Sequence, residues 1–213
     1  MKIMMQKSAQ TRPDIPDDRD ASGMDAPHAD ADAVDDAALV RAAQADPVAF
    51  GQLYQAYRDR VYWYLLARTG NAEDAADLTQ QVFLKTLDAL AQYKPQRGPF
   101  VAWLFGVARN AAANFRQRTR PTVAWEYVTG EAALATAQSL EDAVVRRESL
   151  EQLVRLCAAL DPARQELLAL RFVGGLTSAE IAAVMGKSEA ATKRQLSRIV
   201  QSLKEQYHDI HEA

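Results

Sequence analysis

The fold is decided by residues 176–204, LTSAEIAAVMGKSEAATKRQLSRIVQSLK. Thr177 precedes an apolar helical pattern and Glu180 follows three residues later, which is the spacing of a capping box at a helix N-terminus. Gly186 supplies a tight turn after this short helix, and Ser188 is a suitable N-cap for the next helix. The stretch therefore predicts a short helix, a glycine turn and a longer helix, which is a helix-turn-helix.

The longer helix has one apolar and one basic face. Its buried stripe is expected to consist of Leu196, Ile199, Val200 and Leu203. Between residues 187 and 204 the bases are Lys187, Lys193, Arg194, Arg198 and Lys204, and the only acid is Glu189. A basic amphipathic helix after a glycine turn suits a recognition helix in the DNA major groove. The alternative is an ordinary helical hairpin with a solvated basic face.

Composition extends this helical character to the whole chain. Its 213 residues include 40 Ala and 21 Leu but only 15 Val and 5 Ile, and Gly and Pro together number 17. Helix formers in this excess predict an all-α protein. The single cysteine, Cys157, excludes a disulfide framework and a multi-cysteine metal site, and we expect it to be a small buried hydrophobe.

No targeting or membrane segment is evident. The apolar run at residues 1–7 is too short for a signal peptide, and no stretch approaches the ~20 apolar residues of a membrane span. The sequence predicts a soluble, cytoplasmic protein.

Charge is divided unevenly along the chain. Residues 1–36 hold nine Asp and four basic residues, a net charge of −5, whereas the remaining 177 residues carry 19 acids and 21 bases, a net charge of +2. So acidic a segment with few large apolar side chains is predicted to be a disordered tail. It is either a solvating extension or a nucleic-acid mimic that shields a basic surface of the same chain.

Apolar periodicity divides the rest into two helical domains at residues 37–120 and 140–207. The predicted boundaries in the first are an N-cap at Asp46-Pro47, a break at Thr69-Gly70-Asn71, a helix over 74–90, a loop over 93–99 and a helix from Phe100 that Pro121 ends. Residues 121–139 are predicted to form a flexible linker with a short helix around 130–137. In the second domain we expect helices over 140–160 and from Asp161-Pro162 to about Gly174, then two short helices, a final one to about Tyr207, and a tail at 208–213.

A basic and aromatic patch lies at the end of the first domain. Residues 94–120 contain no acid and the bases Lys94, Arg97, Arg109, Arg116, Arg118 and Arg120, with Phe100, Trp103, Phe105 and Phe115 among them. Bases with interleaved aromatics suit phosphate neutralisation and stacking on unpaired nucleotides. Trp103 lies on the apolar stripe and is expected in the core, whereas Phe105 lies off it and is the better stacking candidate. The amide of Asn110 could read a base edge.

Three segments carry a family resemblance. DLTQQVFLKTL (77–87), FVAWLFGVARN (100–110) and LDPARQELLALRFVGGLTSAEIAAVMGKSEAATKRQLSR (160–198) resemble the extracytoplasmic-function (ECF) group of bacterial sigma-70-type RNA polymerase sigma factors. The resemblance covers residues 37–207 and implies that the two domains correspond to sigma regions 2 and 4. It also implies core RNA polymerase and promoter DNA as partners, and allows for an anti-sigma factor.

The resemblance assigns roles to three groups of residues. The polymerase-binding positions are Asp77, Gln80, Gln81 and Leu84. The positions that recognise and melt the −10 element are Lys94, Arg97, Phe105, Arg109, Asn110, Arg116 and Arg118, where Asn110 helps to capture a flipped base. The positions that recognise the −35 element are Lys187, Ser188, Ala190, Ala191, Lys193, Arg194, Ser197 and Arg198.

The sequence departs from the family pattern at two places in the recognition helix. Ala190-Ala191-Thr192 stands where many relatives have Gly-Thr-Val, and Gln195 stands where they often have Arg. A threonine at a partly buried position and a lost phosphate contact would alter the −35 preference without changing the fold.

Catalysis has little support in the sequence. The histidines His28, His208 and His211 lie in the two tails, and no phosphate-binding loop or nucleophile–base pair is present. We therefore expect no catalytic residue, metal or cofactor. Two other classes stay open: a stand-alone helix-turn-helix regulator, which would be a dimer with an effector pocket, and an enzyme with an appended DNA-binding module.

Overall fold

The computed structural model describes residues 36–118 and 140–212, which are helical with short turns and contain no strand. The all-α prediction is confirmed. The predicted acidic tail, the linker with its short helix, and Arg120 lie outside the described residues. No helix in the described ranges is long and apolar enough to cross a membrane.

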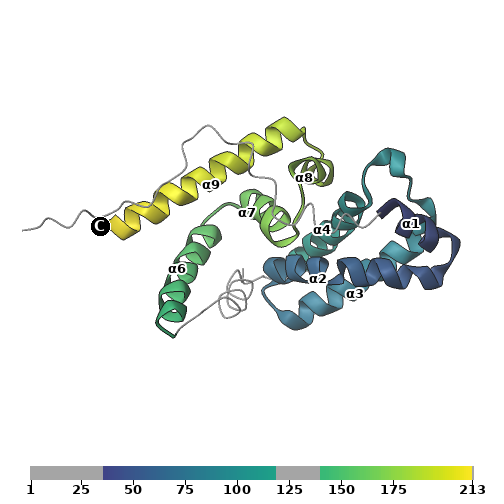
Figure 1. The fold of residues 1–213 in the computed structure, drawn as a ribbon, viewed down its shortest axis with the longest axis horizontal. Coiled ribbons are helices and arrows are strands. Elements are labelled where there is room, and N and C mark those ends of the chain that lie inside the picture. Colours follow the sequence, from purple (N-terminus) through teal and green to yellow (C-terminus); the bar gives the residue numbers. More distant parts are fainter. Residues whose placement is uncertain (1–35, 119–139, 213) are drawn as a thin grey trace, which may run out of the picture.

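The first domain is a group of packed helices that occupies one end of the molecule (Figure 1). Its elements are α1 (Asp36–Ala45), η2 (Pro47–Ala49), α2 (Phe50–Thr69), α3 (Ala72–Ala89), η3 (Leu90–Gln92), η4 (Pro95–Arg97) and α4 (Phe100–Arg118). The η elements are single 3₁₀ turns.

The predicted boundaries of these helices have clear local causes. The Asp46 side chain accepts a hydrogen bond from the Val48 amide and so caps η2, and Gly70 ends α2 in the left-handed region at φ 70°. Asn71 caps α3 by accepting from the two amides at positions 73 and 74. Because of this cap, α3 begins at Ala72, two residues before its predicted start.

The core of the first domain lies between α2, α3 and α4. Its centre is formed by side chains that are completely buried or nearly so: Leu53, Val61, Leu65, Val82 and Leu104. Phe83 of α3 makes edge-to-face contacts with Phe50 and Tyr54 of α2, with ring centroids 6.3 and 4.9 Å apart. This packing fixes the exposed faces of α3 and α4.

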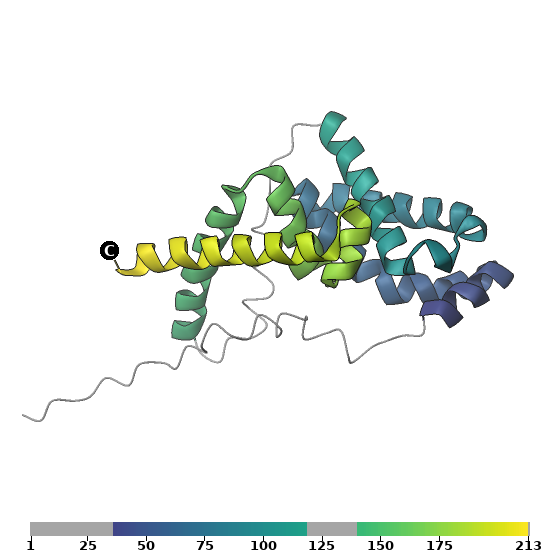
Figure 2. The same cartoon turned by 90° about the horizontal axis from the view of Figure 1, so that it is seen from above.

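The second domain lies at the other end of the molecule (Figures 1 and 2). Its elements are α6 (Leu140–Ala158), α7 (Pro162–Leu168), the π-helical turn η5 (Ala169–Val173), α8 (Ser178–Met185) and α9 (Glu189–Glu212). The prediction of two short helices before the last one is wrong, because the chain passes from η5 to α8 alone. The last helix also runs to Glu212 rather than Tyr207, since no helix-breaking residue follows Tyr207.

Two side chains join α6 to α7. Asp161 caps α7 by accepting from the amides of Ala163 and Arg164. The buried Gln165 amide donates to the carbonyls of Ala158 and Leu160 at 3.0 Å, which satisfies the C-terminal end of α6. Cys157 is only 7% exposed, and burial raises its pKa to about 11, which confirms its expected place in the core.

The helix-turn-helix forms as the sequence predicts. The Thr177–Glu180 capping box has both of its reciprocal hydrogen bonds, and Gly186 ends α8 in the left-handed region at φ 64°. The Ser188 hydroxyl accepts from the Ala191 amide at 3.3 Å, at the start of α9. Leu196 and Ile199 are buried, so α9 turns its apolar stripe towards the domain core and its basic face outward.

The two domains touch. Helix α8 packs against α4, and η5 packs against α2, so the second domain rests on two of the three helices that form the first domain's core. Both views place α7 and α8 beside α2 and α4, while α9 extends away from the first domain (Figures 1 and 2). Neither periodicity nor capping signals predicted this contact between the domains.

Candidate nucleic-acid and polymerase interface

The predicted polymerase-binding residues form one exposed face of α3. Asp77, Gln80, Gln81 and Leu84 are all exposed, and their spacing of three and four residues puts them on one side of the helix. Leu84 is 62% exposed. Leu87 is 37% exposed and extends this surface. Exposed leucines beside amide side chains are typical of a protein–protein contact.

Three of the predicted −10 residues line one hollow. Lys94 and Arg97 from the loop after η3 and Asn110 from α4 border a cavity of about 370 Å³. Tyr93 and Trp103 form aromatic walls of the same hollow, with ring centroids 5.2 Å apart. The structure therefore brings together two cations, an amide and two aromatic rings.

Hydrogen bonds hold this loop in place. The Gln44 amide of α1 donates to the carbonyls of Leu90 at 2.9 Å and Tyr93 at 3.0 Å, and the Tyr93 hydroxyl donates to the Gly98 carbonyl at 2.9 Å. Burial raises the pKa of Tyr93, so its hydroxyl stays a neutral donor. Sequence reasoning missed Tyr93; its position directly before a basic loop with two prolines was the available signal.

Phe105 is not where the sequence placed it. Its ring was expected to be free for stacking but is completely buried, edge-to-face on Tyr64 with centroids 5.5 Å apart. The error has a physical cause: α4 is buried on two faces, by the first domain's core and by the second domain. The periodicity of apolar residues identifies one buried face of a helix, but it does not show that another domain buries a second face. Trp103, expected in the core, is half-buried, and its remaining surface lines the hollow.

The other predicted −10 residues do not line the hollow. Arg109 and Arg116 are half-buried, and Arg118 is exposed in the last turn of α4. The Arg109 Nε is buried and lacks a hydrogen-bond partner within the described ranges. Arg116 and Arg118 lie on α4 beyond the hollow, whereas Arg109 lies between Val107 and Asn110, which line it.

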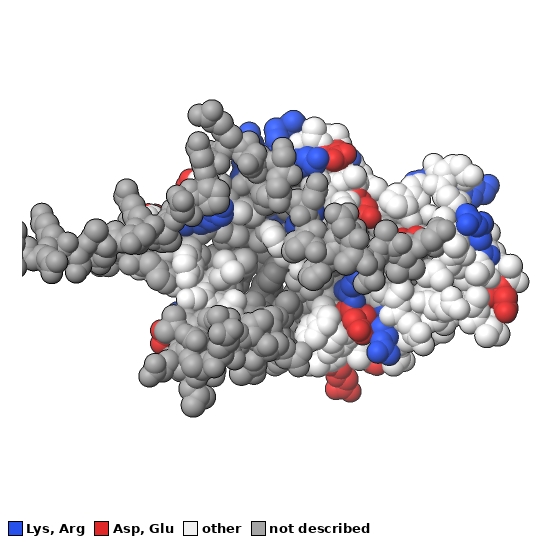
Figure 3. All heavy atoms as spheres, viewed as in Figure 1, with Lys and Arg blue, Asp and Glu red and all other residues white. Residues whose placement is uncertain are grey.

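The predicted −35 residues cover the outer face of α9 and the turn before it. All of them are exposed except Ala191, which is half-buried. Lys193 pairs with Glu189 at 2.9 Å, and the Lys187 ammonium donates to the Gln195 amide at 3.0 Å. Figure 3 shows Lys and Arg side chains near the start of α9, with an acidic side chain beside them.

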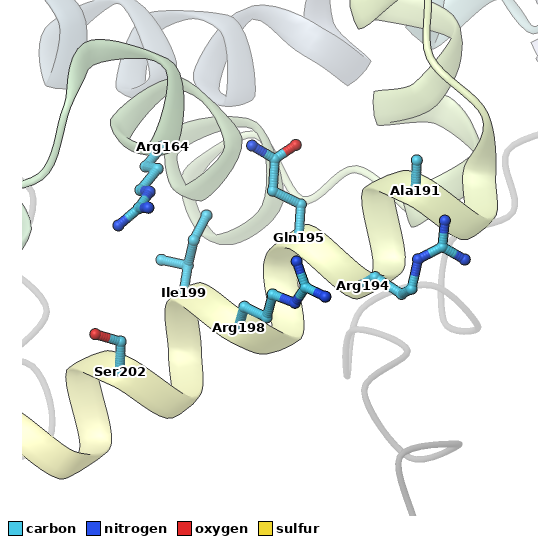
Figure 4. Close-up of a pocket in the computed structure, with 7 residues that line it drawn as sticks. All are labelled: Arg164, Ala191, Arg194, Gln195, Arg198, Ile199 and Ser202. Carbon is cyan, nitrogen blue, oxygen red and sulfur yellow. The ribbon is translucent and has the colours of Figure 1, made fainter.

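A groove of about 520 Å³ separates α9 from α7. Its arginines come from both helices: Arg164 from α7, and Arg194 and Arg198 from successive turns of α9 (Figure 4). Arg164 was not identified from the sequence, because it lies before the helix-turn-helix and pairs locally with Asp161. Both side chains of that pair are 52% exposed, so the Arg164–Asp161 contact at 3.0 Å is weak.

Comparison with known proteins explains this arrangement. Two family models match: Sigma-70 region 2 over residues 53–122, and Sigma-70, region 4 over residues 150–203. The chain is 39% identical over 180 residues to the ECF RNA polymerase sigma factor BldN of Streptomyces coelicolor, covering 83% of this chain and 67% of that protein. The chain belongs to the ECF RNA polymerase sigma factors. The expected resemblance is confirmed.

Other relatives agree with this membership. The sigma factor is 29% identical over 175 residues to the ECF RNA polymerase sigma factor SigD of Mycobacterium tuberculosis, covering 80% of this chain and 82% of that one. The solved structure of CnrH in complex with the cytosolic domain of CnrY has the same fold, with a TM-score of 0.60. That match covers 82% of this chain and 97% of CnrH at 23% identity.

Proposed function

We propose that this sigma factor directs promoter-specific initiation through three surfaces: the α3 face for core RNA polymerase, the hollow on α4 for the −10 element, and α9 for the −35 element. The observation that carries the proposal is the hollow, where Lys94, Arg97 and Asn110 meet the rings of Tyr93 and Trp103. The domains are proposed to span residues 37–120 and 140–207.

The hollow suits a nucleotide taken out of the DNA stack. Flipping a base costs a few kcal/mol, which stacking on an aromatic ring and hydrogen bonds to the base edge can offset. Tyr93 and Trp103 would supply the stacking surface, and Asn110 the donor and acceptor. Lys94 and Arg97 are exposed and would neutralise the phosphates on either side.

The exposed face of α9 suits the major groove of duplex DNA. Arg194 and Arg198 lie on neighbouring turns and, with Arg164 across the groove, place three guanidinium groups at one surface. Guanidinium groups bind phosphates and guanine edges in a bidentate manner. Gln195, whose amide oxygen accepts from the Lys187 ammonium, stands where relatives often have Arg, so the phosphate contact of that Arg would be lost here.

The protein would act by binding rather than by catalysing a reaction of its own. It would work where RNA polymerase works, in the cytoplasm. We also propose an anti-sigma factor as a partner, since a solved relative, the sigma factor RpoE from Bartonella quintana, is in complex with the anti-sigma factor NepR.

Run-off transcription tests the proposed function. Core polymerase with this protein should initiate at genomic promoters that core polymerase alone ignores. Failure on every enriched promoter would contradict the proposal. A stand-alone regulator would instead bind operator DNA tightly, as a dimer, without polymerase, so mobility shifts with and without core polymerase separate the two functions.

A further inference from the structure

The loop over residues 93–99, here called the −10 loop, carries two of the proposed −10 residues and is tightly folded. Its 3₁₀ turn η4 is closed by hydrogen bonds from the Arg97 and Gly98 amides to backbone carbonyls, at 3.0 and 3.1 Å. Gly98 leaves this turn at φ 133°, a backbone conformation that residues with a side chain rarely adopt. This geometry places the exposed side chains of Lys94 and Arg97 at the border of the hollow.

The −10 loop is anchored from α1, a helix that contributes no residue to the hollow. The side-chain amide of Gln44, in the last turn of α1, donates from its nitrogen to the carbonyls of Leu90 at 2.9 Å and Tyr93 at 3.0 Å. A primary amide nitrogen carries two hydrogens, and these two bonds use both of them. One carbonyl belongs to the turn η3 and the other to the first residue of the loop, so Gln44 fixes the point at which the loop begins.

Helix α1 is itself fixed to the core of the first domain. Val40 and Ala43 of α1 are buried, and Ala43 directly precedes Gln44. At the other end of the helix, the Tyr57 hydroxyl of α2 donates to the Asp36 carboxylate. The backbone of Gln44 is therefore held in place by the domain core, and its amide can transmit this order to the −10 loop.

A second hydrogen bond closes the −10 loop on itself. The Tyr93 hydroxyl donates to the Gly98 carbonyl at 2.9 Å, across the turn that carries Lys94 and Arg97. The Tyr93 ring packs edge-to-face on the buried Phe100, with centroids 5.6 Å apart. The two parts of Tyr93 thus act separately: the ring lines the hollow, whereas the hydroxyl restrains the backbone.

We propose that Gln44 and the Tyr93 hydroxyl are positioning groups, which hold the −10 loop in the conformation that captures a flipped base. Neither group is proposed to contact DNA. A loop without these restraints would lose conformational entropy when it bound the strand, which weakens binding, whereas a loop already in the bound conformation avoids this loss. The inference rests on the proposed function, in which Lys94, Arg97 and Asn110 bind the −10 strand.

Three substitutions at Gln44 separate its hydrogen bonding from its bulk. Gln44→Ala removes the amide, and Gln44→Glu keeps its shape but places a carboxylate, which only accepts, against two carbonyls. Gln44→Lys restores hydrogen-bond donors on a flexible side chain, so it should hold the loop again. The control is Gln52→Ala, which removes an exposed glutamine of α2 that does not line the hollow.

Tyr93→Phe isolates the second restraint. This substitution removes the hydroxyl that donates to Gly98 and keeps the ring that lines the hollow. Its control is Tyr62→Phe, which removes the hydroxyl of a half-buried tyrosine on α2 that does not line the hollow. Unfolding midpoints and circular dichroism establish that each full-length variant is folded.

Hydrogen exchange of the free protein reports the order of the loop without DNA. The amides of residues 94–98 should exchange about three- to tenfold faster in Gln44→Ala, Gln44→Glu and Tyr93→Phe, the factor that one hydrogen bond commonly contributes. Gln44→Lys and both controls should match the parent protein. Exchange at the parent's rate in Gln44→Ala and Tyr93→Phe would overturn the claim that these groups hold the loop. Parent-like exchange in Gln44→Glu but not in Gln44→Lys would show that bulk, not donation, is responsible.

Holoenzyme binding reports the effect on base capture. The probes are a labelled single strand with the non-template −10 sequence of a promoter found by run-off transcription, and copies with one abasic site at successive positions. For the parent protein, removing the captured base should weaken binding most, by about tenfold. In Gln44→Ala and Tyr93→Phe this penalty should shrink to about threefold, because a strand without that base gains nothing from an ordered loop. Gln44→Lys and both controls should keep the full penalty.

An unchanged penalty in the folded variants Gln44→Ala and Tyr93→Phe would refute the positioning role. Weaker binding by the same factor for every probe would also refute it, because a general loss of stability acts on all strands alike. Failure of the proposed function has a different signature. The parent holoenzyme would then show no position with a larger penalty, while hydrogen exchange would still decide whether Gln44 and Tyr93 hold the loop.

Discussion

Asn110 follows Trp103 by seven residues on α4, so the two side chains lie two turns apart on one helix face and line the same hollow. The pair combines an aromatic plane with an amide edge, the two features that recognition of an unstacked base requires. Lys94 reaches this hollow from the preceding loop and adds a positive charge. The −10 surface is thus assembled from separate segments rather than from one run of sequence.

Asn110→Ala should impair promoter opening more than polymerase binding. Loss of base-edge hydrogen bonds worth ~1–3 kcal/mol should reduce the open complex by about tenfold or more, measured as permanganate reactivity of unpaired thymines. Affinity for core polymerase should not change, because Asn110 lies on α4 and not on the exposed face of α3. Asn114→Ala is the control, since Asn114 is exposed on the same helix but does not line the hollow. An unchanged open-complex yield would refute the flipped-base role.

Arg164→Ala and Arg194→Ala should each weaken holoenzyme binding to promoters that contain a −35 element. If each guanidinium neutralises one phosphate, each variant should reduce the slope of log affinity against log salt by about one. Arg155→Ala, which removes an exposed arginine of α6 away from this groove, should leave the slope as it is. A slope unchanged in Arg164→Ala would show that this side chain contacts no phosphate.

The sequence was most informative where local chemistry determines structure. The capping box at Thr177 and the turn at Gly186 depend on residues a few positions apart, and both formed as predicted. The shared exposed face of Asp77, Gln80, Gln81 and Leu84 on α3 also has a local cause, because their spacing of three and four residues matches the helical period. The placement of Phe105 failed because its environment comes from Gly174, which is 69 residues away in the sequence.

The two site residues that the sequence did not identify have the same explanation. Tyr93 and Arg164 gain their proposed roles only because the fold brings them next to Asn110 and Arg194, respectively. The basic loop after Tyr93 was a weak signal for that residue, and the sequence around Arg164 contained none. Contacts between distant segments, and above all contacts between domains, lie beyond what periodicity and capping signals can predict.

Leu84→Ala together with Gln80→Ala should weaken binding to core RNA polymerase. An exposed leucine that becomes buried in a protein interface commonly contributes ~1–2 kcal/mol, so about a tenfold loss of affinity is expected for the double variant. Anisotropy of the labelled protein titrated with core polymerase measures it. The matched control is Val48→Ala with Gln55→Ala, because Val48 is 84% exposed and both residues lie outside α3. Equal affinities for the two double variants would contradict the assignment of this face.

The protein should lose stability in alkaline solution because of Tyr57 and Tyr64. Burial, followed by an interaction with a carboxylate, raises the pKa of both hydroxyls above the ordinary value of 10.0; the carboxylates are Asp36 for Tyr57 and Glu166 for Tyr64. In the unfolded chain these tyrosines lose their protons above about pH 10, while the folded chain retains them. The contribution of each tyrosine to the free energy of unfolding should therefore be steady below pH 10 and then fall by ~1.4 kcal/mol per pH unit.

Cys157 adds to this alkaline loss over an earlier range. Burial raises its thiol pKa from 9.0 to about 11, so its contribution is complete below pH 9 and disappears as the pH rises to about 11. The midpoints of urea unfolding, measured from pH 8 to 11, report the combined loss of stability from the two tyrosines and Cys157. Tyr57→Phe should make the free energy of unfolding fall less steeply above pH 10, by the ~1.4 kcal/mol per pH unit that one proton contributes. Cys157→Ala should make it fall less steeply between pH 9 and 11. Slopes identical to that of the parent chain in both variants would show that other groups cause the alkaline loss.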